Sequence, residues 1–266
     1  MDMIKNLKKK GIVVNLYKNH EYILYYARIM LKQRVAGSYL GFLWLFLQPL
    51  MFMLIYSFVV TVIFSNRIPN FNIYVLIGLN AWSLIQRTIM ISATSIVRNK
   101  SIFEQVYFHK FVYPTIYMIS YTYEFLISTS LVFIMMAFSD VPFTWHLLEM
   151  IPVLFICMMF SLGCGLIVAH IGVYLFDLAN ILEFTMRFIF YLSPIMWSYE
   201  NLSFSLIWLF KLNPVSILLG SFRSCILYGK SPVYAYLVII GLFSCILIQI
   251  GYKLISWYED DYARII

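Results

Sequence analysis

The junction within residues 32–49 constrains the fold more than any other part of this sequence. A basic, amphipathic segment ends at Arg34 and gives way within a few residues to an apolar run that continues to Phe64. A Lys or Arg side chain that followed this run into hydrocarbon would cost about 3 kcal/mol. The junction therefore marks the edge of a lipid bilayer. Eight of the nineteen Lys and Arg residues lie at or before Arg34, so we expect this edge to be the cytoplasmic one.

The composition supports an integral membrane protein rather than a soluble one. Hydrophobic residues make up 62% of the 266 residues and charged residues 12%. In a soluble domain, roughly half of the residues are hydrophobic and about a quarter are charged. The net charge of +7 does not indicate nucleic-acid binding, because the positive residues cluster beside apolar runs. The N-terminus shows no signal peptide, so we expect the first span to direct its own insertion. The four cysteines lack metal-like spacing and are expected to be packing residues.

The apolar runs predict a single all-α membrane domain over residues 1–266 with six transmembrane helices, each near the ~20 residues that a bilayer requires. The predicted spans cover about residues 40–64, 73–97, 111–138, 148–176, 178–197 and 233–257. Small residues at Gly163, Gly165 and Gly172 should allow close helix packing along the fourth span. We expect Gly37 and Gly41 to do the same before the first span.

The region 200–230, between spans five and six, is apolar but interrupted by Lys211, Asn213-Pro214 and Arg223. Each half is too short to cross a bilayer alone, so we predict two short re-entrant or interfacial helices that return to the outer side. A seventh span is the alternative. With six spans, both termini and the loop 98–110 lie in the cytoplasm of a multi-pass cytoplasmic-membrane protein. Before the first span, residues 12–34 are expected to form an amphipathic interfacial helix, with a plain juxtamembrane anchor as the alternative.

Several motifs, in this order and spacing, resemble those of a known family. They are Lys32-x-Arg34-x3-Ser38-x-Leu40-Gly41-x2-Trp44-x4-Pro49, then Asn99-x2-Ile102, then Phe190-Tyr191-Leu192-Ser193-Pro194-Ile195, then Leu212-Asn213-Pro214 followed by Phe222-Arg223. This pattern resembles the ABC-2 type polysaccharide exporter permeases, the membrane subunits that export O-antigen, capsule or wall teichoic acid. The last two motifs look most like the teichoic-acid branch. The resemblance covers nearly the whole chain.

The resemblance implies a transporter permease rather than an enzyme, with no catalytic residue and no metal site of its own. The sequence contains no GxxxxGK[ST] motif for binding ATP phosphates. ATP and Mg are therefore expected on a partner, two copies of a soluble ATP-binding subunit docked on a homodimer of this permease. We expect the interfacial helix and the loop 98–110 to dock on that subunit. The loop's candidate coupling residues are Glu104, Gln105, Tyr107 and His109.

Aromatic residues are the candidate lining of a glycan channel. They make up 19% of the chain, and several fall deep within predicted spans. Tyr and Trp can stack on the apolar face of a sugar ring and hydrogen-bond its hydroxyl groups. The candidates are Phe52, Tyr56, Tyr74, Trp82, Tyr117, Tyr121 and Tyr191, and for each of them a place facing lipid or the core is the alternative.

Charged residues within or beside the spans give two further predictions. Arg87 and Glu124 lie at similar depths in adjacent spans, which favours an ion pair between them. Arg28, Lys32 and Arg34 lie in the last turns before the first span, where their charge suits a substrate diphosphate that enters from the cytoplasmic leaflet.

The sequence as a whole, with the resemblance, predicts a subunit of an ATP-driven exporter of a polyprenyl-diphosphate-linked polysaccharide, in contact with membrane lipids. Two alternatives remain. An ABC-2 exporter of drugs or small lipids would have fewer deep aromatic residues. A membrane-embedded acyl- or glycosyltransferase would have clustered Asp and His residues at one interface, whereas the four histidines here are scattered.

Overall fold

The computed structural model describes residues 12–63, 68–99, 109–198, 210 and 212–265. Within these ranges every regular element is a helix. The helices are α2 (Ile12–Lys18), α3 (His20–Val35), η1 (Gly41–Leu43), α4 (Trp44–Phe58), η2 (Val59–Ile63), α5 (Phe71–Arg98), α7 (Val112–Ala137), η3 (Trp145–Glu149), α8 (Met150–Tyr174), α9 (Leu178–Leu192), α11 (Pro214–Ile226) and α12 (Tyr234–Ile265). The prediction of an all-helical fold is confirmed for the described residues.

Five helices in these ranges are long and apolar enough to cross a membrane. They are Gly41–Ile63, Phe71–Arg98, Val112–Ala137, Trp145–Tyr174 and Tyr234–Tyr262. Their bounds lie close to those predicted for spans one, two, three, four and six. The chain is therefore a multi-pass membrane protein by the length and composition of its helices.

The fifth predicted span, 178–197, is shorter than expected. Its helix α9 ends at Leu192 after 15 residues, about 22 Å at the usual helical rise and less than the ~30 Å of a bilayer core. The reason is Pro194, which disfavours helical geometry at the preceding residue. Ser193 accordingly has an extended backbone with φ −92° and ψ 145°. The count of six spans stays a prediction.

Of the two short helices predicted in region 200–230, the structure describes one. This is α11, which begins at Pro214, and its N-cap residue Asn213 accepts a hydrogen bond from Val215 N–H at 3.0 Å. The residues predicted to form the first of these helices lie almost entirely outside the described part of the chain. Helix α11 packs against α5, α8 and η3.

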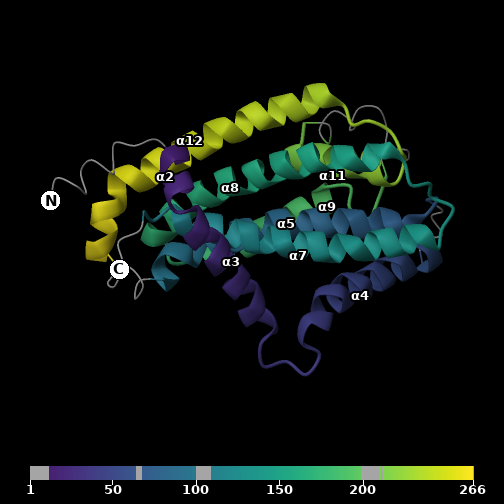
Figure 1. The fold of residues 1–266 in the computed structure, drawn as a ribbon, viewed down its shortest axis with the longest axis horizontal. Coiled ribbons are helices and arrows are strands. Elements are labelled where there is room, and N and C mark those ends of the chain that lie inside the picture. Colours follow the sequence, from purple (N-terminus) through teal and green to yellow (C-terminus); the bar gives the residue numbers. More distant parts are fainter. Residues whose placement is uncertain (1–11, 64–67, 100–108, 199–209, 211, 266) are drawn as a thin grey trace.

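Four long helices, α5, α7, α8 and α12, lie side by side along the length of the molecule (Figure 1). Helix α8 packs against both α5 and α12 through its glycines, as predicted. A Cβ added at Gly172 would lie 1.9 Å from the carbonyl oxygen of Ala93, and one at Gly163 would lie 2.8 Å from Leu247 Cβ. The backbones of these helices therefore approach each other more closely than any larger residue would permit.

The predicted interfacial segment is two helices with a break at Asn19, rather than one. Helix α3 buries Ile23 and Ala27, which lie one helical turn apart, against α7. It then diverges from the bundle and meets α4 at a sharp corner (Figure 1).

The corner between α3 and α4 corrects the prediction for Gly37 and Gly41. Both have positive φ angles, +77° and +47°, and a Cβ at either would have no neighbouring atom within 4 Å. These glycines allow a turn whose backbone conformation other residues rarely adopt, and they do not mediate close helix packing.

Candidate functional site

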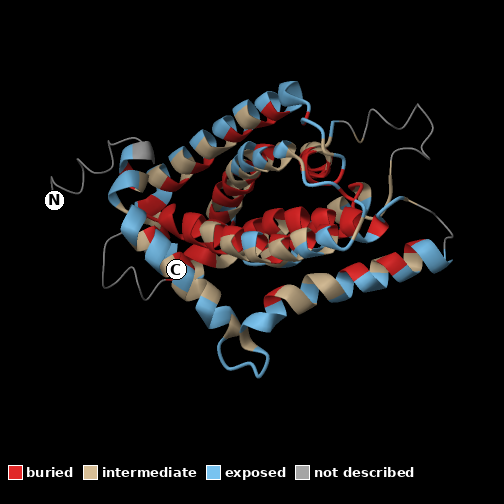
Figure 2. Cartoon of the chain, turned by 45° about the vertical axis from the view of Figure 1, so that its right-hand side comes forward, coloured by how far each residue is buried: buried red, intermediate tan, exposed pale blue. Residues whose placement is uncertain are grey.

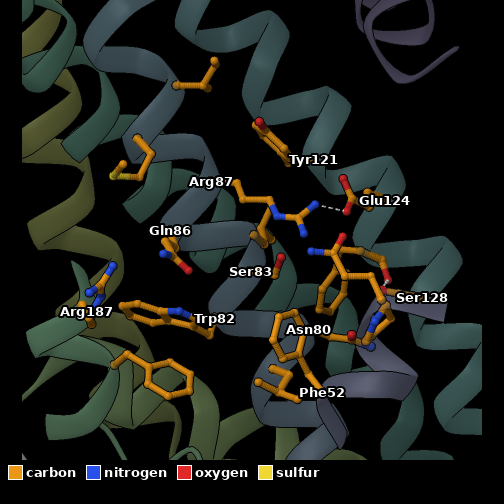
Figure 3. Close-up of a pocket in the computed structure, with 18 of the residues that line it drawn as sticks. Phe52, Asn80, Trp82, Ser83, Gln86, Arg87, Tyr121, Glu124, Ser128 and Arg187 are labelled. Atoms are coloured by element: carbon orange, nitrogen blue, oxygen red, sulfur yellow. Dashed lines mark hydrogen bonds and ion pairs between the residues drawn. The ribbon is translucent and has the colours of Figure 1, made fainter. Parts of the chain in front are cut away.

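A cavity of about 790 Å³ lies between α4, α5, α7 and α9 (Figure 3). Its wall combines aromatic, polar and charged side chains. Pro49 and Pro194 lie in or next to the helices that border it, α4 and α9. We take this cavity as the candidate functional site because it gathers more of the predicted residues than any other place in the described chain.

One side of the cavity is a continuous series of aromatic rings from three helices. The centroid of Tyr56 lies 6.2 Å from that of Phe52 and 5.9 Å from that of Phe190, and Trp82 lies 5.8 Å from Phe190. Tyr191 adjoins Phe190 at 5.3 Å. These five residues are called the aromatic wall below.

Five of the seven aromatic channel candidates line the cavity: Phe52, Tyr56, Trp82, Tyr121 and Tyr191. The other two do not. Tyr74 is 3% exposed and its hydroxyl group donates to the carbonyl oxygen of Trp197 at 2.7 Å. Tyr117 is buried in the core, where its hydroxyl oxygen accepts from Asn99 Nδ2 at 3.5 Å. Phe190, which links the rings of the aromatic wall, belongs to the motif Phe190–Ile195, but its place in the cavity was not predicted.

A layer of uncharged polar side chains also lines the cavity. Gln48 comes from α4, Asn80, Ser83 and Gln86 from α5, and Ser128 from α7. Figure 3 shows the α5 and α7 members near the rings of Phe52 and Trp82. Asn80 is 4% exposed, and its Nδ2 has no hydrogen-bond partner among the described residues. A buried amide donor without a partner is costly, so this position suits a hydroxyl group of a ligand or water.

Three charged residues meet at the edge of the cavity. Glu124 of α7 uses one carboxylate oxygen to accept from Arg87 Nη1 and the other to accept from Arg34 Nη1. The structure thus contains the Arg87–Glu124 ion pair expected from the sequence (Figure 3) and adds Arg34, whose guanidinium lies 4.1 Å from the centroid of the Tyr121 ring. The side chains of Arg34, Arg87 and Glu124 are 29%, 27% and 13% exposed. These three residues are called the charged cluster below.

The other two predicted entry residues, Arg28 and Lys32, lie apart from the charged cluster. Both are exposed on α3. Ile23 and Ala27 define the buried face of this helix, and Arg34 follows Ala27 by seven residues and therefore returns to the same face. Arg28 and Lys32 lie on other faces for the same reason.

A second ion pair lines the cavity from α9. Arg187 Nη2 donates to Glu183 Oε1 at 2.9 Å, one helical turn away, and both side chains are about 60% exposed. This is the local pairing that i,i+4 spacing favours.

The predicted coupling loop is only partly described. Glu104, Gln105 and Tyr107 lie outside the described residues. His109 is 5% exposed, and its Nδ1 lies 3.2 Å from Glu259 Oε2. Glu259 Oε1 also accepts from the Lys110 backbone N–H at 3.0 Å, and burial lowers the pKa of the Lys110 amine. His109 is therefore an anchor at the end of the loop rather than an exposed docking residue.

The sequence did not predict the structure around the end of α12. The acidic segment after residue 257 continues the helix to Ile265 and buries Glu259 and Tyr262. The hydroxyl oxygen of Tyr262 lies 2.6 Å from His170 Nδ1 of α8. Nearer the middle of α12, Tyr252 OH accepts from Asn15 of α2 at 3.1 Å. One helix thus joins α2, α8 and the end of the predicted coupling loop.

The sequence indicated Arg223 only as a motif residue and as an interruption of the apolar region 200–230, and gave no role for it. It lies on α11, is 3% exposed, and donates to the carbonyl oxygens of Pro194, Ile195 and Tyr74 at 2.5, 3.0 and 3.2 Å. Its guanidinium lies 3.4 Å from the centroid of the Tyr74 ring. Arg223 therefore fixes the turn that follows α9.

The described residues show no group of three or more His, Cys, Asp or Glu side chains that could hold a metal ion. The chemistry of the cavity is that of stacking, hydrogen bonding and charge pairing.

Comparison with known proteins agrees with this architecture. Residues 22–227 match the family model described as ABC-2 type transporter. The chain is 27% identical over 258 residues to the O-antigen export system permease protein RfbA of Myxococcus xanthus, covering 95% of this chain and 98% of the relative. It is 23% identical over 237 residues to a protein of the same name from Klebsiella pneumoniae, covering 89% and 91%. The chain therefore belongs to the ABC-2 type transporter membrane family.

Proposed function

We propose that this chain is the membrane-spanning subunit of an ATP-driven exporter, which moves a polyprenyl-diphosphate-linked polysaccharide across the cytoplasmic membrane. Its relatives named as O-antigen export permeases align with nearly the whole chain. The observation that carries the proposal is the cavity, which is lined both by the aromatic wall and by amide and hydroxyl side chains.

This combination suits a sugar chain in transit. Aromatic rings stack on the C–H faces of sugars, and amides and hydroxyls pair with their edges. Movement through a path requires several sites of modest affinity rather than one tight site. A series of rings with centroids 5.3–6.2 Å apart supplies such sites in succession.

The cavity is the interior of a path rather than a lipid-facing groove. Glu183 and Arg187 border it with about 60% of each side chain exposed. Charges exposed to hydrocarbon are costly, and intramembrane charges face water or other protein. The exposed side of α9 also carries apolar residues, among them Phe184 and Phe188. We propose that a second copy of the chain covers α4 and α9 and closes the path as a homodimer.

Energy comes from two copies of an ATP-binding subunit that carry the ATP and Mg. In this proposal they dock on α2, α3 and the loop 98–110, at one end of the bundle. This end, with both termini, lies in the cytoplasm. The diphosphate enters beside Arg28, Lys32 and Arg34 while the lipid tail stays in the bilayer. The concentration of Lys and Arg in residues 1–34 supports this orientation.

Depletion of the chain in its own cells tests the proposal. We expect polyprenyl-diphosphate-linked glycans to accumulate, measured by mass spectrometry of the lipid extract. Re-expression of the wild type should clear them, whereas Tyr56→Leu in the cavity should clear them more slowly. Tyr236→Leu on the exposed face of α12 is the matched control. An extract unchanged by depletion would contradict the proposal.

A further inference from the structure

The charged cluster has an unbalanced charge. Two guanidinium groups, from α3 and α5, share the single carboxylate of Glu124. The other charged pair of the cavity, Glu183 and Arg187, is neutral by itself. Among the described side chains, the edge of the cavity next to α7 therefore holds an excess charge of +1.

The geometry leaves hydrogen-bonding capacity on both arginines. Each uses Nη1 for Glu124, whereas a guanidinium has five N–H donors on three nitrogen atoms. The ring of Tyr121 supports Arg34 from one face, which restricts its orientation. Two oriented guanidinium groups converge on one point here. A phosphate group, with its several anionic oxygens, is a better partner for both of them than a single carboxylate is.

We infer that Arg34 and Arg87 bind one phosphate-type anion, and that the carboxylate of Glu124 occupies their N–H groups when this anion is absent. Arrival of the phosphate-type anion exchanges one acid for another, and the Glu124 carboxylate turns to the cavity that it already lines. The inference rests on the proposed function only for the source of the anion. A prenyl diphosphate and a phospholipid headgroup present the same chemistry.

The inference also separates the three predicted entry residues. Arg34 belongs to the binding site itself, together with Arg87. Arg28 and Lys32 are exposed on other faces of α3 and act through general attraction, about 1 kcal/mol for each charge near an anionic surface. Arg87 should therefore matter more for binding than Lys32, although it lies more than fifty residues further along the chain.

Binding of radiolabelled farnesyl diphosphate to the purified chain in phosphatidylcholine nanodiscs tests the site. Arg87→Gln should weaken binding about tenfold, the effect of losing one charge-assisted contact. Arg264→Gln, at the exposed end of α12, is the matched control, since it removes the same charge away from the cavity, and should leave the affinity unchanged. Equal affinity of Arg87→Gln and wild type, or equal losses in the two variants, would overturn the inference.

Glu124→Gln keeps the size of the side chain and guards against a trivial folding defect. If the carboxylate competes with the ligand, this variant should bind farnesyl diphosphate several-fold more tightly than wild type. If the cluster only holds α3, α5 and α7 together, Glu124→Gln should lose binding as Arg87→Gln does, and that result would overturn the inference.

Nanodiscs with added phosphatidylglycerol distinguish the two sources of the anion. Competition by this lipid against farnesyl diphosphate would assign the site to phospholipid headgroups, and no competition would assign it to prenyl diphosphates. Because the assay needs no ATP-binding subunit and no glycan, a failure of this site leaves the test of export unaffected, and the reverse also holds.

Discussion

Helices α4 and α5 differ in both hydropathy and burial: α4 is the more apolar of the two and is the less buried. The most apolar stretch of the span Gly41–Ile63, which contains α4, has a mean hydropathy of 2.1, and 17% of that stretch is buried, whereas the most apolar stretch of α5 has a mean hydropathy of 1.2 and 67% of it is buried. Figure 2 shows the buried residues, in red, concentrated in the central helices, whereas the helix at the open edge is mostly tan and pale blue. In a bilayer, lipid takes the place of a hydrophobic core, so the less apolar helix lies inside among protein partners.

The difference explains where polar chemistry is found in this molecule. Helix α5 carries Asn80, Ser83, Gln86 and Arg87 along one side, and all four line the cavity. Helix α4 contributes Gln48 and rings and buries few residues, and its outer face is exposed and apolar. Changes on α5 and on the helices packed against it should therefore affect stability, and changes on the exposed faces of α4 and α9 should affect assembly.

The largest effect is expected at the contact between α5 and α8. A methyl group added by Gly172→Ala would lie 1.9 Å from the Ala93 carbonyl oxygen, which forces the backbones apart at a cost of about 3 kcal/mol. Gly220→Ala on α11 is the control, because no atom lies within 4 Å of its Cβ position, and should be neutral or slightly stabilising. Thermal unfolding in detergent measures both. Similar melting temperatures for the two variants would show that α5 is not tightly packed.

A smaller loss is expected for Arg223→Lys. Lysine keeps the charge but cannot donate to three carbonyl oxygens in a plane, so about 2 kcal/mol should be lost. The control is Arg187→Lys, on the exposed side of α9, which should cost less than ~0.5 kcal/mol. The same thermal measurement applies, and an equal tolerance at both positions would contradict the role given to Arg223.

A loss of about 1 kcal/mol is expected for Glu259→Gln, which removes a charge beside His109 and Lys110. Burial lowers the pKa of Lys110 from 10.5, and Glu259 opposes this shift. A lowered pKa means that the unfolded state binds more protons, so the Lys110 contribution to stability rises as the pH increases toward 10.5. The deficit of Glu259→Gln relative to wild type should shrink over the same window, as Lys110 loses its charge.

Asp260→Asn, the exposed neighbour, should show no such pH dependence. A deficit of Glu259→Gln that stays constant with pH would separate Glu259 from the charge of Lys110.

The smallest effect on stability is expected on the exposed face of α9. Phe188→Ala should change the melting temperature of the monomer very little, because Phe188 is 67% exposed. It should nevertheless weaken the proposed homodimer, measured by single-molecule photobleaching in liposomes. Phe243→Ala on α12 is the control, and an equal dimer fraction in both variants would count against α9 as the interface.

The sequence predicted the spans well where length and composition decide them. The second span was expected at residues 73–97 and is Phe71–Arg98, and the third was expected at 111–138 and is Val112–Ala137. Local signals also existed for the early end of α9, since Pro194 disfavours helix at Ser193. They were outweighed by an apolar run that continues to Trp197.

Site residues were predicted correctly only where the position of a residue within its own span determines its surroundings. Tyr117 and Tyr121 lie one turn apart on α7, yet only Tyr121 lines the cavity, because the placement of neighbouring helices determines which face is open. Arg34 and Glu124 are 90 residues apart, and no local sequence pattern predicts their contact. Arg223 stood in a recognised motif, but its three carbonyl partners lie on segments 28 to 149 residues away.

The most direct test of the central claim, that a glycan passes along the aromatic wall, is photocrosslinking in cells. Benzoylphenylalanine replaces Phe190 in the aromatic wall or, as a control, Phe243 on the exposed face of α12. During active export, irradiation should crosslink the residue at the Phe190 position to the glycan. The crosslinked protein should appear as a ladder of slower-migrating bands, which periodate oxidation of the glycan removes. The Phe243 position should give no such ladder. Equal ladders at both positions, or none at the Phe190 position while export continues, would contradict the account.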